Sequence, residues 1–166
     1  MQEVNILDYS TEVLKGLPKG VFLNAKAGDK KNVMTIGWMT LGRQWNQTCL
    51  TIMVRPSRFT NGLIQANPVF TVSIPIKGDF KDAVAICGTQ SGRDMDKIAA
   101  CNFETVDAQT IDGFIVKGCG LHVECEIADI RQMDASFRND SIKEAWYKEE
   151  DWHYYYTAVV KKAYIE

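Results

Sequence analysis

The sequence predicts a mostly β domain, a β-barrel with a few short helices, and three observations support this. Segments with apolar alternation or β-branched residues outnumber helical segments along the 166 residues. The helix candidates are short and lie between strand candidates. Strands and helices do not alternate regularly, which argues against a doubly wound parallel sheet.

The strand candidates begin with a hairpin. Residues 21–26 and 32–41 flank the Gly/Asp turn at 27–31, a pattern typical of two antiparallel strands. The later candidates share apolar alternation or a β-branched run, and they are residues 48–55, 69–74, 121–130 and 154–164. In 121–130 the apolar residues fall on one face, which indicates a half-buried strand.

Three short helices are expected between these strands. Residues 57–66 begin with an N-cap residue, Ser57, directly after a proline. Residues 80–86 form a second candidate. The third spans 91–100, and its opening Ser91-Gly92-Arg93-Asp94 has the S-x-x-D form of a capping box.

Length and charge restrict the class of protein. A chain of 166 residues suits one domain, expected over residues 1–166. The formal net charge of −2 does not favour nucleic acid as a partner. No apolar run reaches the roughly 18 residues of a membrane span. The first residues are acidic and lack a signal peptide's apolar region, so we expect a cytoplasmic protein without a membrane partner.

Cysteine and histidine usage restricts the chemistry. The five cysteines include no C-x-x-C pair, and we expect reduced free thiols. The two histidines, His122 and His153, lie in no metal-binding motif, so no metal site is expected. Redox or hydrolytic chemistry would therefore come from an organic cofactor or from carboxylates.

Two segments have the character of anion sites. In residues 55–60, arginines and hydroxyl side chains stand where a strand ends and a helix is expected to begin, and unpaired N–H groups at a helix start favour a phosphate. Residues 91–97 again place Ser, Arg and Lys at an expected helix start, with a glycine that would let an anion approach. The alternative is a plain helix cap with a solvated cation, and Asp94 and Asp96 count against an anion.

Aromatic residues form a third feature. Trp38, Trp45 and the cluster at 152–156 could be core or subunit interface. However, residues 32–38 mix an amide, a hydroxyl and an indole, which is the mixture that a planar polar heterocycle such as a flavin requires. The only G-x-G, at 118–120, precedes a strand and lacks the third glycine of a dinucleotide fingerprint.

Five segments, in order and spacing, resemble the flavin reductase-like and flavoredoxin family. NVMTIGW at 32–38 resembles the family's N-x-M-T-x-S/G-W, and RFT at 58–60 resembles its R-x-T. CGTQSGRDMDK at 87–97 is similar to C-G-x-x-S-G-R-D-x-D-K. LHVEC at 121–125 and DWH at 151–153 resemble L-x-x-E-C and D-x-H. Together these segments extend over nearly the whole chain from about residue 21.

The resemblance implies an FMN-binding split β-barrel that forms a homodimer, with FMN at or near the interface. The residues implied to line the isoalloxazine and ribityl region are Asn32, Thr35 and Trp38. Those implied to lie near the phosphate are Arg58, Thr60, Ser91, Arg93 and Lys97. His153 and Tyr155 are implied to approach the flavin, in this subunit or from the partner.

The function implied is that of an FMN-dependent oxidoreductase, which transfers hydride or electrons between NAD(P)H and a flavin or a flavin-reduced acceptor. The chemistry would occur on the flavin, so no protein residue is expected to be catalytic. Two alternatives stay open: a flavoredoxin-like electron carrier without NAD(P)H activity, and a non-catalytic β-barrel interaction module. Beyond the homodimer, the expected partners are a redox protein or free flavin.

Overall fold

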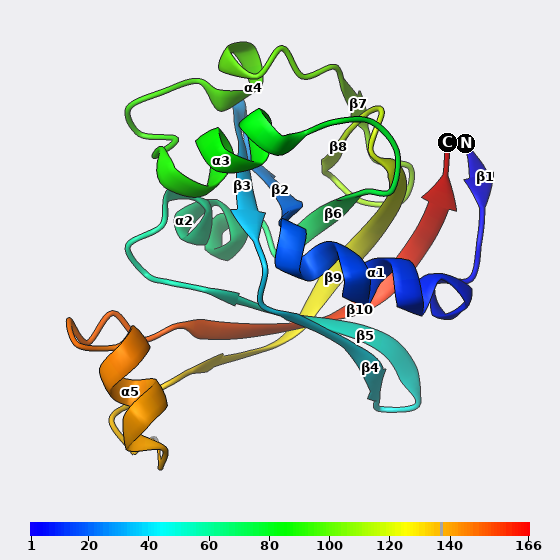
Figure 1. Cartoon of the computed structure of the whole chain (residues 1–166). Coiled ribbons are helices and arrows are strands. Elements are labelled where there is room, and N and C mark those ends of the chain that lie inside the picture. The colour runs from blue at the N-terminus through cyan, green and yellow to red at the C-terminus, as the bar shows by residue number, and fades with distance from the viewer. Residues whose placement is uncertain (137) are drawn as a thin grey trace.

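One antiparallel sheet dominates the computed structural model, which describes residues 1–136 and 138–166 (Figure 1). Its strand order is β3-β2-β6-β9-β10-β5-β4, with β1 paired to β10. The strands of this sheet are β1 (Gln2–Glu3), β2 (Val21–Ala27), β3 (Lys30–Ile36), β4 (Met39–Gln44), β5 (Gln47–Val54), β6 (Val69–Pro75), β9 (Gly120–Gln132) and β10 (Tyr154–Ile165). A separate pair consists of β7 (Thr105–Asp107) and β8 (Phe114–Val116).

Short helices surround the sheet. They are η1 (Ile6–Tyr9), α1 (Ser10–Gly16), η2 (Leu17–Lys19), α2 (Phe59–Ala66), α3 (Lys81–Thr89), α4 (Lys97–Ala100) and α5 (Asp140–Trp146). The mostly β fold with short helices is thus confirmed. No helix among the described residues is long and apolar enough to cross a membrane.

One predicted strand was wrong. Residues 32–41 were expected as a single strand, but β3 ends at Ile36 and β4 begins at Met39. The strand is interrupted at Gly37. A Cβ there would lie 3.0 Å from the Leu17 carbonyl oxygen, so η2 packs closely against the backbone at this point. The next strands form a second tight hairpin through Trp45 and Asn46, both at positive φ as a type I′ turn requires.

Buried apolar residues of the described chain form three clusters, and the two with the most members support the site. The larger lies inside the sheet and includes Leu50, Phe70 and Tyr156, each at most 1% exposed. The smaller lies under α3, where Phe22 packs edge-on against Phe80 and Phe103 at 5.7 and 5.2 Å between ring centroids. The sheet therefore provides a rigid support for the loops beside α2, α3 and α4.

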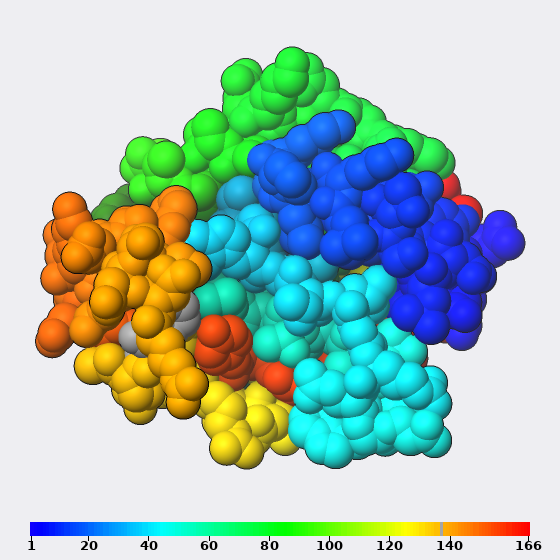
Figure 2. Space-filling model, turned by 60° about the horizontal axis from the view of Figure 1, so that its bottom comes forward, coloured from blue at the N-terminus to red at the C-terminus, as the bar shows by residue number. Residues whose placement is uncertain are grey.

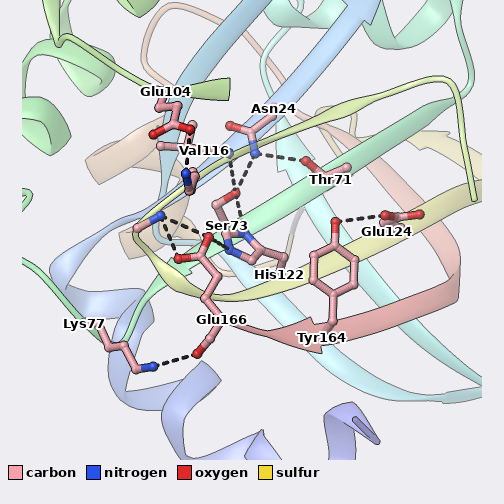
Figure 3. A network of polar contacts seen from close by, with 12 residues as sticks. Asn24, Thr71, Ser73, Lys77, Glu104, Val116, His122, Glu124, Tyr164 and Glu166 are labelled. Carbon is pink, nitrogen blue, oxygen red and sulfur yellow. Dashed lines mark hydrogen bonds and ion pairs between the residues drawn. The ribbon is translucent and has the colours of Figure 1, made fainter. Parts of the chain in front are cut away.

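A buried polar network crosses β6, β9 and β10 (Figure 3). The Ser73 hydroxyl lies 3.0 Å from Nδ1 of His122, and Nε2 of the same ring lies 2.9 Å from Glu166. Beside it, the fully buried Glu124 carboxylate accepts hydrogen bonds from the Tyr164 hydroxyl at 2.9 Å and from the Gln109 and Thr110 backbone N–H groups at 2.6 and 2.7 Å. Glu124 thereby fastens the 107–113 loop to the barrel.

Strands β9 and β10 extend beyond the barrel and carry α5 at their far end (Figure 1). We call residues 138–153 the arm. In Figure 2 the arm (orange) and the β4–β5 hairpin (cyan) form two separate prominences on one face of the molecule. The β9–β10 ladder shifts register between Thr157 and Ala158 and again between Val160 and Lys162, and such irregularities increase strand bending and twist.

Candidate functional site

Two adjoining pockets lie between β3, the start of α2, the α3–α4 connection and the arm. The larger, the cationic pocket, has a volume of about 500 Å³, and the smaller, the aromatic pocket, about 260 Å³. Met34, Arg55, Arg58 and Trp146 line both. The two pockets therefore form one continuous site.

The structure brings nine of the ten residues predicted for the site to these pockets. The cationic pocket is lined by Asn32, Arg58, Thr60, Ser91, Arg93 and Lys97. The aromatic pocket is lined by Thr35, Trp38, Arg58 and His153. Tyr155 lines neither pocket and instead packs against Met133, Tyr147 and Trp152. An approach of Tyr155 to a partner's flavin stays a prediction.

The 55–60 segment differs from the expected helix start. Helix α2 begins at Phe59, because Ser57 donates its hydroxyl hydrogen to the Asp151 carboxylate at 2.6 Å and caps no helix. The second residue of the helix, Thr60, is buried and accepts a 2.7 Å hydrogen bond from the Asn32 side-chain amide. This bond fixes β3 to the start of α2 at the wall of the cationic pocket.

The capping box predicted at Ser91 was wrong. Helix α3 ends at Thr89, and Asp96 caps the short helix α4 by accepting hydrogen bonds from the Ile98 and Ala99 N–H groups at 3.0 and 3.1 Å. The Ser91 hydroxyl instead accepts from the Arg93 N–H within the connecting turn. Gly92 lines the cationic pocket and is required there by packing, because a Cβ would collide with the Asn32 amide and the Phe59 ring; its contact with an anion stays a prediction.

Three cations of the larger pocket donate hydrogen bonds to backbone carbonyl groups. Arg58 donates to Gly88 at 3.3 Å, Arg93 donates to Ser57 at 2.8 Å, and Lys97 donates to Cys87 and Gln90, each at 3.3 Å. None of the three forms an ion pair with a carboxylate of the described residues. Their charges therefore remain available to an anion.

Lys97 is unusual because it is 3% exposed. Burial lowers the pKa of its ammonium group, and the neighbouring Arg58 charge lowers it further, while the Cys87 side chain opposes the shift. A dianion in the pocket would offset both the burial of the ammonium group and its repulsion by Arg58. Among the lining acids, Asp151 is already engaged by Ser57 and by Arg55, whose Nη1 lies 3.9 Å from its carboxylate.

Indole side chains of Trp38 and Trp146 line the aromatic pocket. The Trp38 and His153 rings lie 5.2 Å apart between centroids, and Trp146 of the arm meets Trp38 edge-on at 4.9 Å. The Thr35 hydroxyl donates to the Val84 carbonyl at 2.7 Å, so its hydrogen holds β3 to α3. Thr35 can still accept a hydrogen bond from a ligand.

Arg55 holds the arm in place, a role the sequence did not predict. Its guanidinium donates to the Trp146 and Asp151 carbonyl groups at 2.7 and 2.8 Å and lies 5.2 Å from the Tyr147 ring centroid. Arg55 was expected to join the anion site; it lines both pockets, but unlike the other three cations its guanidinium lies near a carboxylate, that of Asp151. Trp146, the last residue of α5, and Lys148, which follows the helix, also line the cationic pocket, and this helix was not predicted.

We expect acid to destabilise the protein through His153. Burial and then the Arg55 charge lower the pKa of His153 to about 4, whereas the unfolded chain titrates near 6.5. Since the unfolded chain binds this proton more readily, stability is complete above pH 6.5 and is lost as the pH falls toward 4. Between pH 7 and 5 the loss from this residue should be about 2 kcal/mol.

Urea unfolding of the flavin-free protein at both pH values measures this loss. His153→Gln should show a smaller difference between pH 7 and 5 than the wild type. The dependence that survives belongs to other groups, including His122, whose pKa burial also lowers. Equal pH dependence in both proteins would contradict the prediction.

The cysteines are free thiols, and we expect them to be dispensable for ligand binding. Cys87 lines the cationic pocket, but burial, followed by the nearby Cys101, raises its pKa to about 12 and keeps it protonated. A protonated thiol is a poor nucleophile. The Cys87→Ser, Cys101→Ser double variant should bind flavin as the wild type does, measured by fluorescence quenching. Lost turnover with flavin still bound would instead reveal a thiol relay.

Comparisons with known proteins agree with this architecture. Residues 14–153 match the family described as "Flavin reductase like domain". A flavoredoxin from Methanosarcina acetivorans is 24% identical over 89% of this chain and 68% of its own, with a TM-score of 0.69. An FMN-binding domain of a flavin reductases-like enzyme from Shewanella baltica is 18% identical over 98% and 75%, with a TM-score of 0.72.

An NADH:FAD oxidoreductase from Streptomyces globisporus is 17% identical over 92% of this chain and 81% of its own, with a TM-score of 0.65. The comparison with curated proteins found no match. The fold is that of split-barrel flavin reductase-like proteins. This chain therefore belongs to the flavin reductase-like domain family.

Proposed function

We propose that the protein binds FMN and acts as an oxidoreductase, passing hydride or electrons between NAD(P)H and a flavin or a flavin-reduced acceptor. One observation carries the proposal. The cationic pocket holds three cations that form no ion pair with a described carboxylate, and it continues into the aromatic pocket, which an indole side chain lines. FMN combines a phosphate dianion with a planar aromatic ring, so it matches both halves of the site.

Each half of the site would hold one part of FMN. Arg58, Arg93 and Lys97 would bind the phosphate, and Trp38 would pack against the ring. Bound FMN would supply a ring that accepts and releases hydride or single electrons. The protein's residues would fix the cofactor, exclude water from one ring face with Trp38, and place the uncharged His153 beside the ring.

The similar proteins support two versions of this function. The Streptomyces protein is named for NADH and FAD, which favours a nicotinamide-dependent reductase. The Methanosarcina protein is a flavoredoxin, which favours an electron carrier that serves a protein partner. The two versions share the FMN site and differ in whether NAD(P)H reaches it.

Two measurements test the proposal. Titration of the purified protein with FMN should quench flavin fluorescence to a saturating level, and failure to bind any flavin would leave only an interaction module. Steady-state oxidation of NADH and NADPH with free flavin as acceptor then separates the versions. Turnover identifies the reductase, whereas tight FMN binding without turnover identifies the carrier.

We also propose that the protein is a homodimer. Two large apolar side chains of the aromatic pocket are exposed, Trp38 (37%) and Trp146 (52%), and so is Ile142 (43%) on α5. Exposed aromatic side chains close to a pocket are a common mark of an interface. Light scattering after size exclusion should give twice 18.7 kDa, and a single 18.7 kDa species would contradict the dimer.

A further inference from the structure

Tyr147 and His153 form a buried hydrogen-bonded pair behind the aromatic pocket. The Tyr147 hydroxyl oxygen lies 2.8 Å from Nδ1 of His153, and the two rings stand nearly perpendicular at 87°. His153 lines the pocket and is 6% exposed, whereas Tyr147 packs behind it against Met133 and Trp152. The arm thus supplies both partners.

The position of the single hydroxyl hydrogen decides which nitrogen of His153 carries the proton. In the part of the chain that the structure describes, the Tyr147 hydroxyl lies 2.8 Å from Nδ1 of His153 and 3.3 Å from the Met133 sulfur. An unprotonated imidazole nitrogen accepts strongly, whereas a thioether sulfur accepts weakly. The hydroxyl therefore donates to Nδ1, and the ring proton of His153 lies on Nε2.

Burial, followed by the charges around His153, lowers its pKa and keeps the ring neutral. Arg55, which lies over the Tyr147 ring, and Arg58 both disfavour a second proton, and Asp151 only partly opposes them. No side chain or backbone group of the described residues hydrogen-bonds to Nε2. The Nε2 hydrogen is therefore the one polar group of His153 left for a ligand.

We propose that Tyr147 is a positioning residue that fixes His153 in the Nε2-protonated tautomer, so that the aromatic pocket contains one uncharged N–H donor for the acceptor atoms of a flavin ring. The tautomer follows from the contacts within this chain. The hydrogen bond from Nε2–H to a flavin rests on the proposed function.

Nitrogen-15 NMR of the flavin-free protein at pH 7 tests the tautomer directly. The chain has two histidines, so a His122→Gln variant assigns the His153 signals. We expect the proton on Nε2 in the wild type and a mixture of tautomers in Tyr147→Phe, which keeps the ring but lacks the donor. Met133→Leu is the matched control, because it removes the weaker acceptor and should leave the tautomer unchanged.

Flavin titration tests the use of the donor. Tyr147→Phe should bind FMN and riboflavin about threefold to tenfold more weakly, equally for both, because one neutral hydrogen bond to the ring is affected. Met133→Leu should bind both as the wild type does.

The outcomes are separable. A proton on Nδ1 in the wild type, or a tautomer that changes in Met133→Leu, would overturn the role of Tyr147. The expected tautomer with unchanged flavin affinity in Tyr147→Phe would overturn the donor's use. A wild type that binds no flavin would overturn the proposed function and that use together, while the tautomer result would still stand.

Discussion

Arg93→Ala should weaken FMN binding about tenfold to a hundredfold and leave riboflavin binding nearly unchanged. The two ligands differ by a phosphate, and a charge-assisted hydrogen bond to it is worth roughly 1.5–3 kcal/mol. Arg93 is exposed and its guanidinium donates to the Ser57 carbonyl, so its charge is free for the phosphate. Fluorescence titration of each variant with both flavins measures the effect.

Matched variants separate charge from packing. Arg43→Ala removes an exposed arginine on β4 that lines neither pocket, and should bind both flavins as the wild type does. Trp38→Ala should weaken both flavins alike, because it removes packing against the ring. Equal loss of FMN and riboflavin in Arg93→Ala would show that Arg93 only supports the turn, and the phosphate would then be assigned to Arg58 and Thr60. Lys97→Gln should also discriminate between the flavins, but it additionally disturbs the two carbonyl groups that Lys97 binds.

Glu124→Gln should lower the free energy of unfolding by about 3 kcal/mol or more. The fully buried carboxylate accepts hydrogen bonds from two backbone N–H groups and the Thr110 hydroxyl. It also accepts one from the Tyr164 hydroxyl (Figure 3). An amide offers one oxygen and two N–H donors, so at least one buried donor loses its acceptor and faces another donor. Each such loss costs roughly 1–3 kcal/mol. Urea unfolding without flavin measures the difference.

Glu126→Gln is the control, two residues along the same strand. Its carboxylate is exposed and pairs with Lys161 at 3.0 Å, and surface pairs contribute roughly 0–1 kcal/mol. Similar losses in the two variants would mean that the Glu124 contacts do not determine stability. A large loss in Glu124→Gln alone would confirm that the 107–113 loop is fastened by this carboxylate.

The strands were predictable because alternation places apolar residues on one face of the sheet, and β2, β5, β6 and β9 follow it. The site residues were predictable as an ordered set of short segments. Three cations and an amide reach one pocket because β3, α2 and the α3–α4 connection meet there.

The predictions of the helices were wrong where two capping signals competed, or where tertiary contacts determined the structure. Both Ser91 and Asp96 could cap a helix, and an internal Gly92 makes the longer helix costly, so the later cap prevails. Helix α5 has no buried residue, so it lacks an apolar face that periodicity could detect. Its contact with Arg55 joins residues far apart in the sequence, and no local pattern reveals that contact. Its Asn139 cap, which accepts from the Ile142 N–H, was a signal that could have located it.

The long strand β9 belongs to two environments. Near Val123 it lies between β6 and β10, whereas at Arg131 it pairs with β10 alone and forms an edge of the sheet beside the arm. A strand at the edge of a sheet is paired on one side only, and opening can be local. We therefore expect amide hydrogen exchange to be graded along single strands, slowest at 121–125 and fastest toward 131–132. A ligand held between the arm and the barrel should slow exchange mainly at the distal end, which would make exchange there a measure of occupancy that needs no turnover.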